Sequence, residues 1–251
     1  MSDFNPNIVR NVTPAGVADM SVDVGLRRFM LGVYNKLALG LVVSAALSFL
    51  TGSVPAVQVL LFRLTPDGQI QGYTPLGWVV SLAPLGILLM SGFLARNITP
   101  RTASLIYWSI VALIGASMGS LLFLYTGVSI FSTFLVTASA FGVLSLIGYT
   151  TKKDLTGIGS FLIMGVWGLF IASIVNIWMH SAAIAYIVSG LGVLIFSGLI
   201  AYDTQNMKLR YYALSGDEAA MSVATSYGAL NLYLDFINLF RFLLMFLGAR
   251  R

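Results

Sequence analysis

The sequence predicts an all-α membrane protein with seven transmembrane helices, and three observations carry this prediction. Hydrophobic residues make up 58% of the 251 residues, only 9% are charged, and the mean hydropathy is +0.90. Soluble domains carry about 25% charged residues. Apolar runs of about 20 residues, the length that crosses a bilayer as a helix, recur seven times along the chain. These features together are typical of a polytopic membrane protein.

Short polar or turn-rich segments separate the seven predicted spans. The first 28 residues are polar, and we expect a mobile N-terminal cytoplasmic tail (1–28) before a membrane domain (29–251). A shorter apolar run at 54–62 precedes the turn residues 65–68 and is too short to cross, so we place it at the interface. The predicted spans are 31–53, 76–95, 102–125, 130–149, 158–179, 182–203 and 222–247.

Small residues recur at a spacing of four on the first, third and sixth predicted spans. Helices in lipid have no hydrophobic effect to drive them together, and such stripes let their backbones approach closely. Lining a pore is the alternative interpretation, and we favour packing. The stripes are Gly32, Gly40, Ser44, Ser48 and Gly52; Ala112, Gly115, Ala116, Gly119 and Ser120; and Ala185, Ser189, Ser197 and Ala201.

The seventh predicted span carries a polar stripe of Tyr227, Asn231, Asp235, Asn238 and Arg241. At about 100° per residue, these side chains fall within roughly a third of the helix circumference. An ionisable group costs about 2.5 kcal/mol or more at the bilayer centre, so the stripe should face protein or water. The pattern therefore predicts that this span lies inside the bundle.

The basic residues predict the orientation of the chain. If the N-terminus is cytoplasmic, ten of the 14 lysines and arginines lie on that side, which favours N-in and C-out by the positive-inside rule. The basic residues occupy short loops and form no contiguous patch, so we expect the lipid bilayer and no nucleic acid as a partner.

Asp203 and Asp235 are the two acidic residues at membrane depth, one on each of the last two predicted spans. Sequential antiparallel helices pack as neighbours, so the pair could meet in the cytoplasmic half. Two carboxyls within hydrogen-bonding range and with little water cannot both ionise cheaply, so we expect them to share a proton. The alternatives are that an arginine, Arg96 or Arg241, holds each one separately, or that Asp203 caps the following loop in interfacial water.

The sequence offers little for cofactor chemistry. It has no cysteine and one histidine, His180, with no second histidine or carboxylate near it, so we expect no zinc site and no thiol chemistry. No nucleotide-binding motif opens a helix. We therefore expect no cofactor and no enzymatic activity.

The segment Tyr202-Asp203-Thr-Gln, together with residues 232–240 in the next span, resembles the Bax inhibitor-1 family, also called the transmembrane Bax inhibitor motif family. Residues 28–45 are similar to the first span of its bacterial members, and the similarity covers about 27–247. The resemblance implies a seven-helix fold with the last helix at its centre. It also implies a pH-sensitive calcium leak governed by an aspartate pair on the last two helices, here Asp203 and Asp235.

That family's latch also involves an arginine near the cytoplasmic end of the second span, for which Arg96 is our candidate. The connection predicted at 206–221 is fairly long, and the basic C-terminal tail of animal members is reduced to Arg250 and Arg251. Both departures favour a bacterial inner-membrane protein over a regulator of cell death.

We expect a cation leak gated by protonation of the pair, with Asn231, Asn238, Arg241 and Arg96 as further residues of the gate or pathway. Two aspartates supply fewer oxygens than the six to eight that Ca²⁺ prefers, so they should bind Ca²⁺ weakly, which suits passage. One alternative is a membrane interaction protein that regulates a membrane protease or assembly.

The other alternative is an intramembrane aspartyl protease. A Tyr-Asp in one span and an Asp in the next also form the dyad of presenilin-type proteases, where one protonated and one ionised carboxyl activate water. Asp235 follows Leu232-Tyr233-Leu234 and not the Gly-x-Gly of those proteases. We therefore rank this interpretation below the other two.

Overall fold

The computed structural model describes residues 23–94, 98–214 and 216–250 of the chain. Seven crossings in this part are long and apolar enough to span a membrane, which confirms the predicted fold class. The third of them is continuous over three short elements. The crossings are α1 (Val24–Ser53), α3 (Pro75–Leu94), α4 (Pro100–Ser117) with η3 (Met118–Ser120) and α5 (Leu121–Leu124), α6 (Gly127–Thr150), α7 (Thr156–Met179), α8 (Ala182–Leu214) and α9 (Glu218–Leu247).

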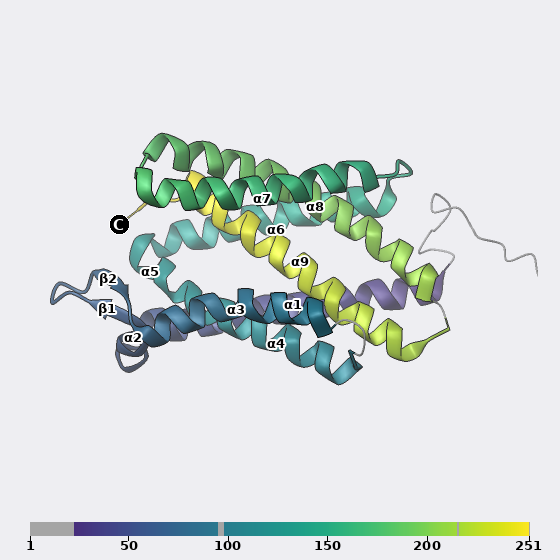
Figure 1. The fold of residues 1–251 in the computed structure, drawn as a ribbon, viewed down its shortest axis with the longest axis horizontal. Coiled ribbons are helices and arrows are strands. Elements are labelled where there is room, and N and C mark those ends of the chain that lie inside the picture. The colour runs from purple at the N-terminus through teal and green to yellow at the C-terminus, as the bar shows by residue number, and fades with distance from the viewer. Residues whose placement is uncertain (1–22, 95–97, 215, 251) are drawn as a thin grey trace, which may run out of the picture.

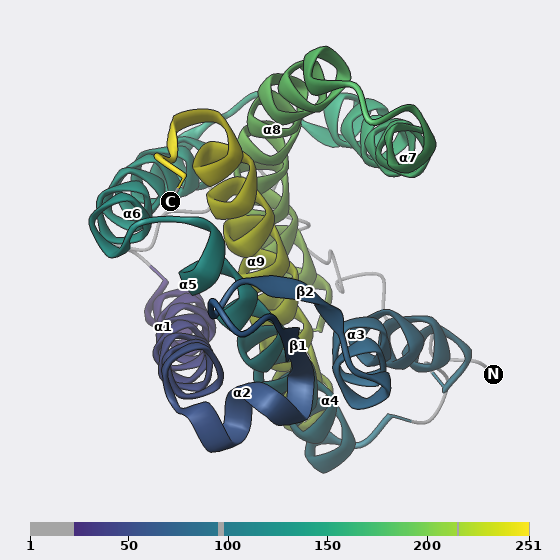
Figure 2. The same ribbon diagram turned by 90° about the vertical axis from the view of Figure 1, so that its left-hand side faces the viewer.

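Helix α9 runs obliquely through the middle of the bundle and contacts α1, α4, α6 and α8 (Figures 1 and 2). A larger share of α9 is buried than of any other crossing in the described residues. Aromatic rings join it to its neighbours: Phe236 lies 5.6 Å from Phe141 of α6, and Phe242 lies 5.8 Å from Phe196 of α8, between ring centroids. The last helix is therefore the core element, as the resemblance implies.

Helices α3 and α7 lie at the edges of the bundle. Helix α3 packs on α4, and α7 packs on α8 (Figure 2). Both present large apolar side chains outward, including Leu82, Leu89, Trp167 and Ile171. In a bilayer this surface is in contact with lipid, which explains why so much apolar area is left uncovered.

The small residues of α1 and α4 pack the two helices backbone to backbone. A Cβ atom placed on Gly115 would lie 2.6 Å from the Cα of Ser44, and one on Gly52 would lie 2.7 Å from the carbonyl oxygen of Gly119. No side chain fits at such distances. The stripes on these two spans therefore serve packing, as the sequence predicts.

The run at 54–62 does not cross the membrane. It forms α2 (Pro55–Leu61), followed by an antiparallel hairpin of β1 (Phe62–Leu64) and β2 (Ile70–Tyr73). Residues 65–68 form its tip, where Gly68 has a φ of +76°. The run is too short to span a membrane, as the sequence predicts, but the sequence did not predict the strands.

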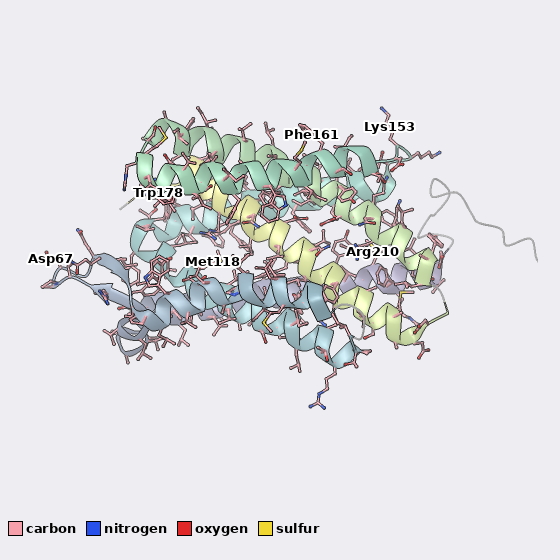
Figure 3. All side chains as sticks on the ribbon, in the orientation of Figure 1. Asp67, Met118, Lys153, Phe161, Trp178 and Arg210 are labelled. Carbon is pink, nitrogen blue, oxygen red and sulfur yellow. The ribbon has the colours of Figure 1, made fainter. Side chains whose placement is uncertain are left out.

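The two ends of the bundle differ in how many lysines and arginines they carry. Asp67 and Trp178 lie toward the end that carries the hairpin, and Lys153 and Arg210 lie toward the opposite end (Figure 3). We call the first the hairpin end and the second the basic end. At the hairpin end the last residues are tied to the start of α6, because Ala249 N donates to Ser129 Oγ at 2.8 Å.

Three helices extend further at the basic end than predicted. Helix α8 continues to Leu214 and α9 begins at Glu218, so the predicted connection at 206–221 is wrong and only three residues join the helices. Residues 206–214 contain no glycine or proline, so the helix continues beyond the end of the apolar run. Helix α1 begins at Val24, and Asp23 caps it by accepting a hydrogen bond from Leu26 N at 2.9 Å.

Candidate functional site

The antiparallel packing of α8 and α9 brings Asp203 and Asp235 together. Asp203 lies about three turns before the end of α8, and Asp235 lies near the middle of α9. The two carboxyls lie close enough to interact with each other electrostatically. Asp235 is only 5% exposed and Asp203 is half-buried. The predicted meeting of the pair is therefore present, inside the helices and not at a loop.

A hydrogen bond between the two carboxyls would require a proton. The Asp235 Oδ2 atom is buried and has no hydrogen-bond partner in the described residues. A carboxylate has no proton to donate, so a hydrogen bond between two carboxyls forms only when one is protonated. Such a pair carries one proton between two sites. Loss of that proton replaces a hydrogen bond with repulsion between two negative charges.

Arg210 is the described cation whose charge acts on Asp203. It lies two turns further along the same face of α8, near the basic end. The sequence interpretation missed it, although the spacing of seven residues on one helix was visible. Arg241 is exposed on α9, and Arg96 lies outside the described residues. The roles of those two arginines stay predictions.

A chain of hydroxyl groups begins at the residue after Asp203. Thr204 Oγ1 donates to the carbonyl oxygen of Ile200 at 2.7 Å and lies 3.1 Å from Ser145 Oγ of α6. Ser145 in turn bonds Tyr34 OH of α1. The chain links three helices beside the pair, and no periodicity in the sequence points to it.

The next turn of α8 holds the connection between α6 and α7. The Gln205 side chain donates through Nε2 to the carbonyl oxygen of Lys153 at 2.8 Å and accepts through Oε1 from Leu155 N at 2.9 Å. The buried Lys208 donates to the carbonyl oxygen of Tyr149, and its ammonium lies 4.7 Å from the centre of that ring. These contacts fix the part of α8 that presents Asp203.

The polar stripe of α9 is only partly covered. Asp235 is its fully buried member, whereas Asn231 and Asn238 are half-buried, with Asn238 Nδ2 donating to the carbonyl oxygen of Leu234 at 2.8 Å. Helix α9 also has a second polar face, opposite the first. There Tyr233 OH lies 2.7 Å from Ser44 Oγ of α1, and both residues are buried. The sequence interpretation missed this face because its residues are spaced seven apart among apolar ones.

Metal ligands are sparse. No group of three or more His, Cys, Asp or Glu side chains that could hold a metal ion occurs in the described ranges. The pair could offer a passing Ca²⁺ its carboxylate oxygens, fewer than the ion prefers. His180 is exposed and ends α7 in the left-handed conformation, with a φ of +50°.

Comparison with known proteins assigns the family. Residues 26–251 match the family described as "Inhibitor of apoptosis-promoting Bax1". The chain is 61% identical over 251 residues to an uncharacterised protein of Caulobacter vibrioides, covering all of both chains. It is 42% identical over 231 residues to a protein of Rickettsia prowazekii, covering 91% of this chain and 92% of the relative. It is 37% identical over 230 residues to the inner membrane protein YbhL of Escherichia coli K12, covering 90% and 94%. The chain therefore belongs to the Bax inhibitor-1 family and is a multi-pass integral protein of the inner membrane.

Proposed function

We propose that this protein is a cation leak, with Ca²⁺ as its ion, that the protonation state of Asp203 and Asp235 opens and closes. The observation that carries the proposal is the contact between these two carboxyls, one of them buried, across the central helix pair. Intramembrane carboxylates are costly and usually belong to an ion or proton pathway.

The shared proton holds the closed state. With it, the carboxyls bond and α8 packs on α9. Without it, two negative charges repel by about 4 kcal/mol at 4 Å for an effective dielectric constant of 20. Gln205 ties α8 to the connection between α6 and α7, so we expect this group to move as a unit away from α9. Arg210 favours the ionised form of Asp203.

The open path would follow the half-buried amides of α9. Asn231 and Asn238 lie on either side of Asp235 along the helix, and their oxygens would complete a weak, transient coordination of Ca²⁺. We place the basic end in the cytoplasm, because Lys and Arg accumulate on that side of bacterial membrane proteins. The gate then lies in the cytoplasmic half.

Calcium flux into proteoliposomes between about pH 5 and 8 tests this function, because that range brackets a shared carboxyl proton. We expect wild-type flux to rise with pH, and Asp203→Asn and Asp235→Asn each to flatten that dependence. Asp154→Asn is the matched control, since Asp154 is an exposed carboxylate at the same end. Its profile should equal that of the wild type.

Two outcomes would refute the leak. If protein-containing and empty liposomes pass Ca²⁺ equally at every pH, no flux is intrinsic to the protein, and regulation of a membrane-protein partner becomes the function to test. If the purified protein cleaves a transmembrane peptide and Asp203→Ala abolishes the cleavage, the pair is a protease dyad. We propose neither, and the family is generally one of non-enzymatic membrane proteins.

A further inference from the structure

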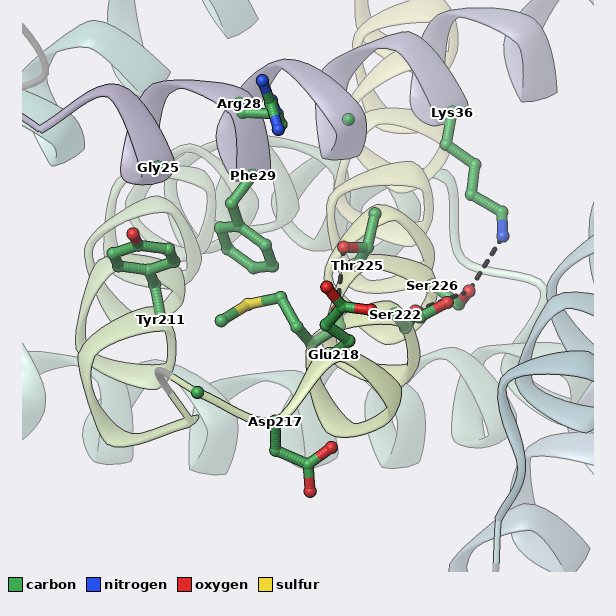
Figure 4. A pocket seen from close by; sticks show the side chains of 13 residues that line it. Gly25, Arg28, Phe29, Lys36, Tyr211, Asp217, Glu218, Ser222, Thr225 and Ser226 are labelled. Atoms are coloured by element: carbon green, nitrogen blue, oxygen red, sulfur yellow. Dashed lines mark hydrogen bonds between the residues drawn. The ribbon is translucent and has the colours of Figure 1, made fainter.

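A cavity of about 650 Å³ opens at the basic end between the start of α1, the end of α8 and the start of α9 (Figure 4). It lies on the other side of α9 from the aspartate pair. Ser226, in the wall of the cavity, and Asp235 are nine residues apart on α9, and at 100° per residue this spacing puts them on opposite sides of the helix. A volume of this size is typical of a small-molecule site and exceeds the space of one ion or water many times.

Lys36 supplies a positive charge at one end of this cavity, and Tyr211 lies at the other end in Figure 4. The Lys36 ammonium donates to Ser226 Oγ at 2.8 Å and to Ser104 Oγ at 3.1 Å, and both partners are neutral hydroxyls. It also lies 5.2 Å from the centre of the Tyr107 ring. An ammonium has three protons, so one more acceptor can bind.

The remaining wall suits a ligand that is part charged and part apolar. Phe29 and Met221 line the cavity, and Arg28, which also lines it, is exposed. Of the two acidic residues there, Asp217 accepts from Ala220 N of its own helix at 2.9 Å, and Glu218 is exposed to solvent. Water screens these exposed charges, whereas the hydroxyl that Lys36 contacts belongs to Ser226, which is 3% exposed.

We propose that this cavity binds a phosphate group, carried by a phospholipid headgroup or by a soluble phosphate ester, with Lys36 as its ligand. Lysine binds phosphate as a point charge. Ser226 positions the Lys36 ammonium, because its hydroxyl accepts from that ammonium at 2.8 Å and donates to the carbonyl oxygen of Ser222 at 3.2 Å. The cavity lies at the basic end of the bundle, where we expect the helix ends to meet the headgroup region, and its apolar side chains match a glycerol backbone better than a free ion. We therefore expect the lipid as the source. This site is separate from the proposed cation gate.

A thermal unfolding experiment on the full-length protein in a phosphate-free maltoside detergent tests the site. The probes are dihexanoyl phosphatidylglycerol, sn-glycerol 3-phosphate, and monohexanoylglycerol, which lacks the phosphate. A ligand that binds the folded state raises the unfolding midpoint. We expect the phosphatidylglycerol to raise the wild-type midpoint by several degrees and monohexanoylglycerol to leave it unchanged. An equal rise with glycerol 3-phosphate would support the site and identify a soluble ester as its ligand.

The variants test the roles of Lys36 and Ser226. Lys36→Met should abolish the rise in the unfolding midpoint that the phosphatidylglycerol causes. Ser226→Ala should reduce this rise, and it replaces Lys36→Met as the test if that variant does not fold. Lys208→Met is the matched control, because Lys208 is a buried lysine at the same end that bonds the carbonyl oxygen of Tyr149 outside the cavity. The Lys208→Met variant should show the same rise in unfolding midpoint as the wild type. The proposal is overturned if no phosphate probe shifts the wild type, if monohexanoylglycerol acts equally, or if both cavity variants respond as the wild type does.

Discussion

Arg210 acts on the aspartate pair from within the same helix, and its removal tests the direction of the proposed gate. The positive charge favours the ionised form of Asp203, which we assign to the open state. Arg210→Gln should therefore move the pH of half-maximal calcium flux upward, on the order of a few tenths of a pH unit because Arg210 is exposed. Arg101→Gln, at the same end, is the control. A downward shift would contradict the assignment of the open state.

Asp23 gives a prediction about stability and pH that does not involve the gate. The hydrogen bond from Leu26 N holds the pKa of the Asp23 carboxyl below its usual range. Because the folded-state pKa is lowered, the cap stabilises the protein above the unfolded-state pKa of about 3.9, and this stabilisation is lost as the pH falls through the folded value. Asp23→Ala should cost about 1 kcal/mol at pH 7.

The measurement is the unfolding midpoint of Asp23→Ala beside the wild type at pH 7 and near pH 3. The difference should shrink at the lower pH, because the stabilisation by the Asp23 carboxylate falls below the unfolded-state pKa and is lost as the carboxyl becomes protonated in the folded protein. Asp67→Ala, in the hairpin tip, should show no such difference at either pH. An equal destabilisation at both pH values would mean that the Asp23 carboxylate is not the capping group.

At the scale of elements, Gln205 joins α8 to the connection between α6 and α7. Gln205→Leu removes both side-chain hydrogen bonds and leaves the Leu155 N–H and the Lys153 carbonyl without them. We expect a loss of about 1–3 kcal/mol of stability and faster amide hydrogen exchange at Leu155. Gln58→Leu, which removes a side-chain bond to Gly52 at the hairpin end, should leave exchange at Leu155 unchanged. Unaltered amide hydrogen exchange at Leu155 in Gln205→Leu would mean that the Gln205 side chain does not hold the connection between α6 and α7.

The packing of α1 on α4 predicts opposite results for two glycine substitutions. Gly115→Ala forces a methyl group against Ser44 and should destabilise by about 1–3 kcal/mol. Gly86→Ala, on the lipid-facing α3, meets nothing within 4 Å and should be neutral or stabilising by up to about 1 kcal/mol. The measurement is the thermal unfolding midpoint of both variants under the same condition, which we expect to be lower for Gly115→Ala than for Gly86→Ala. Similar midpoints would mean that the two helices do not approach so closely.

Hydropathy locates the crossings well and their ends poorly. The predicted 31–53 and 182–203 both lie inside longer helices, because a helix can continue into water once its residues carry polar side chains outward. Met207 and Lys208 are buried while Leu209 and Arg210 are exposed, so α8 keeps a covered face and an exposed face after its apolar run ends. The hairpin was missed because strands of three and four residues leave too short a pattern to read.

At the scale of the molecule, the aspartate pair could be predicted and most of its surroundings could not. Two carboxylates on consecutive antiparallel helices can meet by topology alone. The hydroxyl chain from Thr204, the Gln205 bonds and the contact of Lys36 with Ser226 join helices far apart in sequence. Serine and threonine occur throughout the predicted spans, so nothing in a single sequence marks the ones that pair.

The central position of α9 has a consequence for biosynthesis. The helix around which the bundle packs is the last that the ribosome makes, so α1, α4, α6 and α8 are synthesised before the helix that they all contact. Until residues 218–247 have been made, the faces of α1, α4 and α8 that pack on α9 contact lipid or the insertion machinery. Lys36 lies on one of these faces. We therefore expect the bundle to close only after residues 218–247 have been made, and a chain that lacks them to leave these faces without their partner helix.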